Sequence, residues 1–397
     1  MRVDIVTKEY PPEIYGGAGV HATELVKALR ESIDVEVRAF GAERDEPSTT
    51  SYGVPLELSA ANGALQTLGT DLEIVTDVAG ADVVHSHTWY ANFAGHLASL
   101  LHGIPHVVTA HSLEPLRPWK AEQLGGGYAV SSYIEKTAYE GAAAVIAVSD
   151  GMRTDILRSY PSLDPDKVRV IYNGIDVEAW HPVEDPELLA SLGVDASKPS
   201  VVFVGRITRQ KGLPYFLRAA ALLPPDVQVI LCAGAPDTPQ IMAEVEGLVR
   251  DLQGTREGVV WIDRMLARRE LCTILTAATT FVCPSVYEPL GIVNLEAMAC
   301  GAAVVGTATG GIPEVVVDGV TGRLVPIEQV QDGTGTPVDP ERYVADLARV
   351  LTEVVSDPTQ AAAYGVAGRE RATHDFSWGQ IAEQTQALYA EVIASAR

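Results

Sequence analysis

Two glutamates, Glu288 and Glu296, lie in the stretch CPSVYEPLGIVNLEAMACG at residues 283–301. The preceding run, TTFVCPS, has the length and β-branched content of a buried strand, and helical spacing begins after Gly291. Glu288 is therefore predicted in a strand-to-helix loop, with Glu296 about two turns further on. A helix N-terminus suits a phosphate, and carboxylates at these two places could hold sugar and ribose hydroxyls.

Three basic residues, Arg206, Arg209 and Lys211, directly follow another predicted strand in the run VGRITRQKG. The chain has 29 Lys and Arg against 52 Asp and Glu, a net charge of −23, so clustered cations are unusual in it. At the carboxyl end of a strand they indicate an anion, and they could neutralise a diphosphate leaving group. A solvated surface cluster is the alternative interpretation.

Histidines follow two further predicted strands. His85 and His87 lie on one strand face in VVHSHTW, and His111 lies just past the next strand in TAHSLEP. A neutral imidazole there could hydrogen-bond a substrate hydroxyl or stabilise developing charge. For His85 and His87, crevice lining, structural hydrogen bonding and metal binding stay open, although no nearby Cys or carboxylate completes a ligand set.

The loop after the first predicted strand, TKEYPPEIYGGAGVH, contains Gly16, Gly17 and Gly19 before a helix. Glycines let a backbone approach a ligand closely, and a plain turn is the alternative. The loop is not GxGxxG and no ribose-binding acid follows the second strand, which argues against a nicotinamide fold. The DPD run at 164–166 precedes a strand, at the wrong end for chemistry, and is predicted to be a structural turn.

The elements that must position these residues alternate apolar runs with helical patterns, which is typical of parallel, doubly wound sheets. The pattern loosens in NGIDVEAWHPVEDPE and restarts at SVVFVGR, so two Rossmann-like domains are predicted at 1–185 and 186–375. A continuous helical stretch is expected near 121–140, and a terminal helix within 376–397. Ligands of such sheets bind beyond the carboxyl ends of the strands, where the candidates above fall.

Bulk properties narrow the function further. The length of 397 residues and 47% apolar content suit two globular domains, and the negative charge disfavours nucleic-acid binding. The four cysteines show no CxxC spacing and are expected to be buried, reduced thiols. No motif demands a metal. No signal peptide or apolar stretch of about 20 residues is apparent, so a soluble, cytoplasmic protein is expected.

Six stretches in order, YGGAGVH, VVHSHTW, TAHSLEP, VIYNGID, FVGRITRQKG and EPLGIVNLEAMACG, resemble the retaining glycosyltransferases of family 4. The resemblance implies the GT-B architecture, two Rossmann-like domains facing across a cleft, with a C-terminal segment that crosses back to the first domain. The subgroup that looks most similar comprises bacterial glycogen synthases and actinobacterial enzymes that make α-maltose 1-phosphate. The resemblance implies an ADP-glucose donor and a glucan or sugar-phosphate acceptor. It implies no metal and no other cofactor.

The resemblance also implies roles for single residues. Glu288 and Glu296 match the glutamates of the family's E-x7-E motif, the first at the donor sugar and the second at the ribose. Arg206 and Lys211 match the pair that stabilises the leaving diphosphate, and His111 matches a histidine beside the donor sugar. Further donor contacts are implied for Gly16, Gly17, Leu290, Gly291 and Ile292.

The acceptor-side candidates are His87, Arg117 and Lys120. Arg117 and Lys120, in LEPLRPWK, suit an anionic acceptor such as glucose 1-phosphate, with an ordinary surface pair as the alternative. Ile14 precedes the glycines where many bacterial glycogen synthases carry the Lys of K-x-G-G, and Lys8 lies too far upstream to be assigned as its substitute. This departure and the intact second glutamate favour the short actinobacterial type.

Two other functions remain as alternatives to the glucosyltransferase function. Another family 4 transferase would use a different nucleotide sugar or a small or lipid acceptor, although the chain shows no basic amphipathic helix for a lipid surface. A sugar-nucleotide epimerase or a silent sugar-binding module is the third. The choice between ADP and UDP, the acceptor and the oligomeric state, a homodimer included, stay open.

Overall fold

The computed structural model describes residues 1–396, apart from the side chains at 122 and 123, and forms two compact units. The first comprises Met1–Gly174 and the chain from Trp378 onward, and the second comprises Ile175–Ser377. The boundaries expected from the sequence were 185 and 375, whereas residues 175–185 belong to the second unit. Residue 397, the last of the expected terminal helix, lies outside the described residues.

The first unit is built on a seven-stranded parallel sheet in the order β3-β2-β1-β4-β5-β6-β7. The order reverses between β1 and β4, which pair directly, so this is the point where an open sheet binds ligands. The strands are β1 (Arg2–Thr7), β2 (Asp34–Phe40), β3 (Thr49–Tyr52), β4 (Val83–His87), β5 (His106–Ala110), β6 (Ala144–Ala147) and β7 (Val168–Val170).

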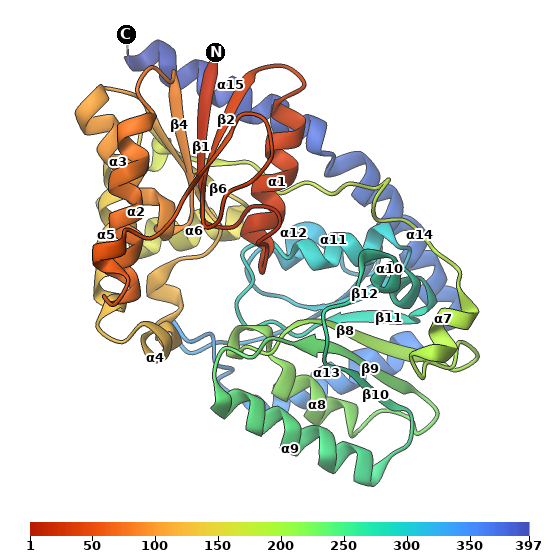
Figure 1. The fold of residues 1–397 in the computed structure, drawn as a ribbon. Helices are drawn as coiled ribbons and strands as arrows, with labels where there is room; N and C mark the ends of the chain where they lie inside the picture. Colours follow the sequence, from red (N-terminus) through yellow and green to blue (C-terminus); the bar gives the residue numbers. More distant parts are fainter. Residues whose placement is uncertain (397) are drawn as a thin grey trace. The chain divides into compact units, whose positions relative to one another are not determined.

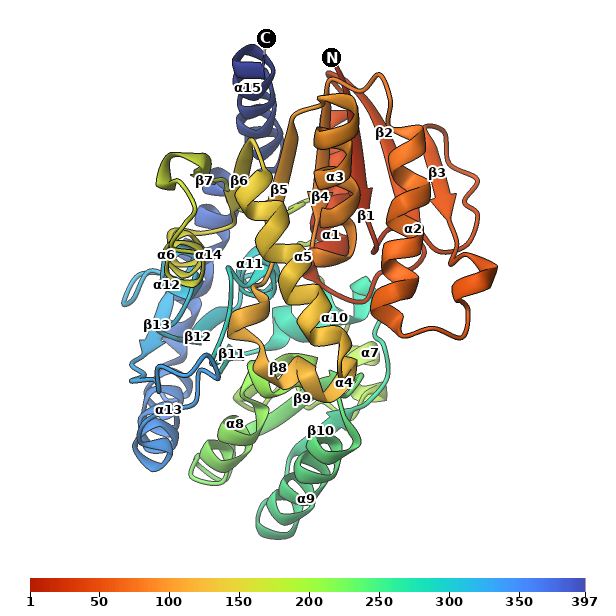
Figure 2. The same ribbon diagram turned by 90° about the vertical axis from the view of Figure 1, so that its left-hand side faces the viewer.

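Helices cover both faces of this sheet. Val3 and Ile5 pack in one cluster with side chains of α1 and α15, whereas Val6 and Val84 pack with α2 and α3. Both faces are therefore buried, which is why the strands read as continuous apolar runs. Figure 1 shows the blue α15 beside the red α1, and Figure 2 turns α2, α3 and α5 toward the viewer. The helices are α1 (Gly17–Leu29), α2 (Gly63–Asp77), α3 (Trp89–His102), α4 (Ala121–Leu124), α5 (Gly127–Gly141), α6 (Asp150–Ser159) and α15 (Trp378–Ala396).

The second unit contains a six-stranded parallel sheet in the order β10-β9-β8-β11-β12-β13, which reverses between β8 and β11. One face packs against α8, α9 and α13 in a large apolar cluster. The strands are β8 (Ser200–Arg206), β9 (Gln228–Gly234), β10 (Val259–Ile262), β11 (Thr280–Cys283), β12 (Ala303–Thr307) and β13 (Gly322–Val325). The helices are α7 (Pro186–Ser191), α8 (Leu213–Ala220), α9 (Pro239–Thr255), α10 (Arg268–Ala277), α11 (Ile292–Ala299), α12 (Ile312–Val315), α13 (Pro340–Val355) and α14 (Pro358–Asp375).

The prediction of two Rossmann-like parallel sheets is confirmed, and one local prediction is wrong. The expected helix over 121–140 is broken into α4 and α5, because Gly125 adopts a φ of +53°, in the left-handed region that favours glycine. The elements β3, α2, α7, α12 and β13 were not predicted. Strands β3 and β13 are short, and turn residues surround the start of α2, so their local patterns were weak.

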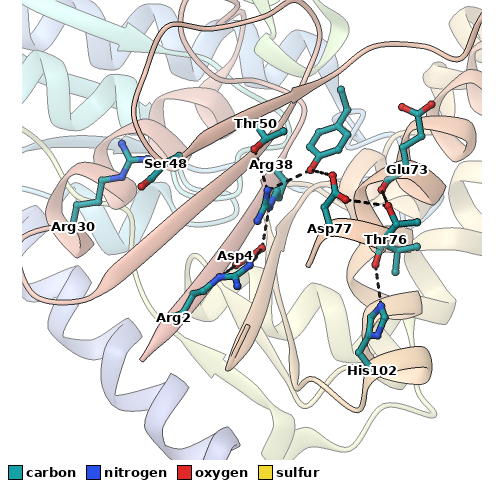
Figure 3. Close-up of polar contacts among 12 residues, drawn as sticks. Arg2, Asp4, Arg30, Arg38, Ser48, Thr50, Glu73, Thr76, Asp77 and His102 are labelled. Atoms are coloured by element: carbon teal, nitrogen blue, oxygen red, sulfur yellow. Dashed lines mark hydrogen bonds and ion pairs between the residues drawn. The ribbon is translucent and has the colours of Figure 1, made fainter. Parts of the chain in front are cut away.

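Charged residues inside the first sheet form a buried network, drawn in Figure 3. The Asp4 carboxylate on β1, fully buried, accepts hydrogen bonds from Arg2 Nε at 3.0 Å and from Arg38 Nε at 2.9 Å. Arg38 Nη1 in turn donates to Thr50 Oγ1 at 3.0 Å. Three neighbouring strands, β1, β2 and β3, are thus joined by side chains as well as by backbone hydrogen bonds.

Candidate active site

The second unit places its predicted residues at the point where the sheet reverses. Strands β8 and β11 are neighbours, and the loops that follow them carry residues 206–211 and 284–291. Because the carboxyl ends of parallel strands meet at one edge, these loops lie side by side. The backbone confirms this, since Val286 N donates to Gln210 O at 2.9 Å.

Lys211 and Glu288 are in direct contact. Lys211 Nζ lies 2.7 Å from Glu288 Oε2, and Ser285 Oγ donates to the same oxygen at 2.9 Å. Burial alone would lower the pKa of Lys211, but Glu288, with smaller contributions from Cys283 and Glu296, outweighs it, so this pKa lies above its ordinary value. The ammonium is therefore charged at neutral pH. Ser285 was missed by the sequence reasoning, and its place three residues before Glu288 was the one available signal.

Close packing holds the two loops together. Gly212 has a φ of +63°, and a Cβ there would lie 2.0 Å from Pro284 O. Gly310, with a φ of +55°, packs equally closely on Glu288 O. A side chain at Gly212 would collide with the backbone of Pro284, and one at Gly310 would collide with the backbone of Glu288. Both glycines are therefore needed to keep Glu288 in its place.

Helix α11 begins directly after this loop. Gly291 caps it with a φ of +92°, Leu290 is buried beside the cap, and Ile292 is the first helical residue. The first backbone N–H groups of a helix have no partner within it and favour an anion. Asn294, in the same first turn, is fully buried, and neither of its side-chain polar atoms has a hydrogen-bond partner among the described residues. The sequence reasoning did not single it out.

Arg206 and Glu296 are not in direct contact with the Lys211–Glu288 pair, although the charges of Glu296 and Lys211 act on each other. Arg206 ends β8, and its Nη2 is 2.5 Å from Asp237 Oδ1, with 41% of the Arg206 side chain exposed. Glu296 lies on α11, where burial raises its pKa to about 7, while the charge of Arg268 opposes this rise. An acid with this pKa is partly protonated at neutral pH.

In the first unit, histidines gather where the sheet reverses between β1 and β4. His87 Nδ1 and His111 Nε2 are 3.0 Å apart, and the His21 ring lies 4.7 Å from the His111 ring, centroid to centroid. His21, which the sequence reasoning missed, is held by a 2.6 Å hydrogen bond to Asn173 Oδ1. Its spacing of four residues from Gly17, on the same helix, was the available signal.

Burial lowers the pKa values of these histidines, and the neighbouring imidazoles add to the effect for His87 and His111. For His21 burial brings the pKa down to about 4. All three rings are therefore neutral near pH 7. Their ligand atoms lie within 4.8 Å of one another, so this trio is the arrangement in the described part of the chain that could hold a metal ion.

His85 has a structural setting. Its Nδ1 is 2.6 Å from the Tyr389 hydroxyl of α15, and its Nε2 is 2.7 Å from Thr109 Oγ1. Both ring nitrogens are thus occupied by protein partners. Of the three interpretations left open for His85, structural hydrogen bonding is the one that this geometry supports.

The Gly-rich loop packs on a buried carboxylate. Gly16 caps α1, Gly17 is the first helical residue, and Tyr15 N donates to Glu9 Oε2 at 3.2 Å. A Cβ at Gly19 would lie 2.7 Å from Glu9 Cβ. A side chain at position 19 would therefore collide with Glu9, so this position requires glycine.

The two acceptor-side cations differ in their surroundings. Lys120 is buried, with its Nζ 3.2 Å from Glu114 Oε1, and Glu114 Oε2 accepts from Ser131 Oγ at 2.6 Å. Arg117 is half-buried, and its Nη1 donates to the neutral Ser112 Oγ at 2.9 Å.

Other sequence predictions are confirmed as structural features. Asp164 caps a turn ahead of β7 by accepting from Asp166 N at 3.0 Å. The four cysteines are buried and free. In the part of the chain that the structure describes, no helix is long and apolar enough to cross a membrane.

Known proteins resemble this chain along nearly its whole length. The profile of Glycosyltransferase Family 4 matches residues 15–179, and that of Glycosyl transferases group 1 matches residues 198–353. The alpha-maltose-1-phosphate synthase of Mycolicibacterium smegmatis is 58% identical over 397 residues, covering 99% of this chain and 100% of that protein. The enzyme of the same name from Mycobacterium tuberculosis is 55% identical with the same coverage. Among solved structures, a sucrose-phosphate synthase from Thermosynechococcus elongatus matches with a TM-score of 0.79 and 24% identity over 100% of both chains.

Proposed function

Because this chain belongs to glycosyltransferase family 4, we propose that it transfers glucose from ADP-glucose to glucose 1-phosphate, forming maltose 1-phosphate with retention at the anomeric carbon. The two mycobacterial relatives support the product by their name and by full-length similarity. The observation that carries the proposal is the Lys211–Glu288 pair, 2.7 Å apart at the reversal point of the second sheet. A fixed cation beside a helix N-terminus suits a departing diphosphate.

On the donor side, Lys211 and Arg206 neutralise the diphosphate as its bond to the anomeric carbon breaks. The backbone N–H groups of Leu290 and Gly291, directly before α11, and of Ile292, its first residue, bind the same phosphates. Glu288 accepts hydrogen bonds from the sugar hydroxyls. Its carboxylate already contacts Lys211 and Ser285, which suits a binding role better than that of the nucleophile in a double displacement.

In the first unit, neutral His111 hydrogen-bonds the glucose that is being transferred from the donor. His87 orients the His111 ring. The acceptor O4 attacks the anomeric carbon on the face that the diphosphate leaves, so the new glycosidic bond keeps the original configuration. The O4 proton passes to the departing phosphate oxygen, which balances the reaction. In this scheme no step requires a metal ion or other cofactor.

The test is a matrix of two donors and two acceptors. Purified protein is incubated with ADP-glucose or UDP-glucose, each with glucose 1-phosphate or glycogen, and nucleotide release and products are measured. The expected outcome is fastest release from ADP-glucose with glucose 1-phosphate, an α-linked maltose 1-phosphate product, and an unchanged rate after EDTA. If no combination releases nucleotide, the proposed function is wrong, and a UDP-glucose preference would correct the donor.

A further inference from the structure

Lys8, Tyr90 and Arg117 form a second cluster of side chains in the first unit, at the same sheet edge as the histidines. Lys8 directly follows β1, Tyr90 lies in the first turn of α3 after β4, and Arg117 lies in the loop after β5. These three strands are neighbours in the sheet, so their carboxyl ends meet. Lys8 Nζ is 3.9 Å from the centroid of the Tyr90 ring, and Lys120 Nζ is 5.7 Å from it.

Lys8 and Arg117 form no ion pair with any described residue, which is notable in a chain of net charge −23. The buried Nε of Arg117 also has no hydrogen-bond partner among the described residues. Lys120 differs, because it is paired with Glu114. Half-buried cations without a direct ion-pair partner are costly, and a bound anion would supply that partner.

Desolvation at this site shows in Lys8 itself. Burial lowers the pKa of Lys8, and the nearby Glu9 carboxylate only partly opposes this. A bound anion would favour the charged ammonium and reverse the shift. The ring of Tyr90, which also packs on Trp89 with centroids 4.2 Å apart, forms an apolar wall beside the ammonium.

Hydrogen bonds with α5 fix the loop that carries Arg117. Glu114 N donates to Glu135 Oε1 at 2.8 Å, and the Tyr128 hydroxyl donates to Glu114 O at 2.6 Å. Together with the hydrogen bond from Ser131 Oγ to Glu114 Oε2, these bonds hold the loop to α5, while the Lys120–Glu114 pair ties the loop to itself. A loop held in this way loses little freedom when a ligand binds, which favours a preformed site.

We propose that Lys8 and Arg117 bind the phosphate group of a sugar-phosphate acceptor, with Tyr90 as the wall of the site and Lys120 as a positioning residue that acts through Glu114. The inference rests on the proposed function and identifies what selects a phosphorylated acceptor over a neutral one. It assigns Lys8, from the end of β1, to the phosphate, and moves Lys120 from direct contact to support. The planar Arg fork and the Lys point charge together suit a phosphate dianion.

The experiment compares Lys8→Ala and Arg117→Ala with the wild type and with Lys136→Ala, a matched change at an exposed i,i+4 pair of the same unit. For each variant, the KM values for glucose 1-phosphate and ADP-glucose are measured, together with transfer to the neutral acceptor maltose. Each lost charged hydrogen bond should raise the KM for glucose 1-phosphate by about 10- to 100-fold. The KM for ADP-glucose and the rate with maltose should stay at the wild-type level, and Arg117→Lys should recover part of the loss.

A binding measurement keeps the inference separate from the proposed function. Thermal shifts are recorded with glucose 1-phosphate, with glucose and with ADP, so that retained ADP binding shows that each variant is folded. Glucose 1-phosphate should stabilise the wild type and Lys136→Ala more than glucose does, and this difference should vanish in Lys8→Ala and Arg117→Ala. An equal shift in all four proteins, or no preference for the phosphate in the wild type, overturns the inference. If the wild type binds glucose 1-phosphate through these residues but transfers nothing to it, the proposed function fails and the phosphate site stands.

Discussion

Each unit contains an ion pair of similar length; the pair in the first unit is buried within the sheet, and that in the second unit is partly buried beyond the strand ends. Arg38 Nε lies 2.9 Å from Asp4 Oδ2 in the middle of the first sheet, and Lys211 Nζ lies 2.7 Å from Glu288 Oε2 beyond the strand ends of the second. The Asp4 and Glu288 side chains are 0% and 7% exposed, and those of Arg38 and Lys211 are 9% and 23% exposed. Because the two carboxylates are almost equally buried, we infer that position relative to the strand ends separates a pair enclosed by the sheet from one beside a candidate ligand site.

Hydrogen bonding separates the two pairs in the same way. Asp4 accepts from two arginines, and Arg38 continues to Thr50 on the next strand, so this network is complete within the protein. The Lys211 ammonium has three N–H donors, and the Glu288 carboxylate takes one of them. The second pair therefore keeps donors that a ligand can use.

The largest effect is expected from Asp4→Ala. This change leaves two arginines without their common carboxylate, and breaking a buried pair costs about 3–5 kcal/mol of unfolding free energy. Urea unfolding measures the loss, and the kcat of the folded protein should be unchanged. Arg158→Ala, at an exposed pair with Asp155, should change stability by less than about 1 kcal/mol. A fall in kcat with unaltered stability in Asp4→Ala would break the comparison between the two pairs.

The next effect is expected from Lys211→Ala in the second pair. If this ammonium stabilises the leaving diphosphate, kcat falls by about 10²-fold or more. Steady-state kinetics measure the change, and circular dichroism checks the fold. The control is Arg209→Ala in the same turn, because that side chain faces Glu244 at 3.6 Å and is 49% exposed. Near-normal turnover of Lys211→Ala, or an equal loss in Arg209→Ala, would remove Lys211 from the proposed mechanism.

A smaller effect, on the pH dependence of nucleotide binding, is expected from Glu296, a carboxylate that belongs to neither pair. Burial raises the pKa of Glu296 to about 7, so the protonated form accumulates below that pH and the carboxylate above it. If ribose hydroxyls donate to this carboxylate, nucleotide binding should weaken as the pH falls from 8 to 6, by up to about tenfold per pH unit below the pKa. Calorimetric Kd values for ADP at pH 6, 7 and 8 measure this. In Glu296→Gln the slope should disappear, while Glu244→Gln should keep it; a flat profile in the wild type would contradict the ribose role.

Residue patterns were sufficient for the parts of the site that follow strand ends. Lys211 and Glu288 were predicted at one edge because parallel strands bring their carboxyl ends together, and the structure places them in contact. Ser285 and Asn294 were missed, since a Ser or Asn near a motif carries no distinctive spacing. The helix predicted over 121–140 was extended across Gly125, Gly126 and Gly127, although three consecutive glycines disfavour a continuous helix.

By itself, the sequence determined the alternation of strands and helices, the two parallel sheets and the strand ends at which chemistry is placed, because all of these follow from local periodicity. Only the tertiary structure decided which side chains have partners. His85 is bonded to Tyr389, 304 residues away, and Lys120 is engaged by Glu114 while Lys8 and Arg117 have no ion-pair partner among the described residues. The His85 pairing depends on how distant elements pack, and the Lys120 pairing depends on the path of an irregular loop and on where its side chains point. Local spacing carries no information about either.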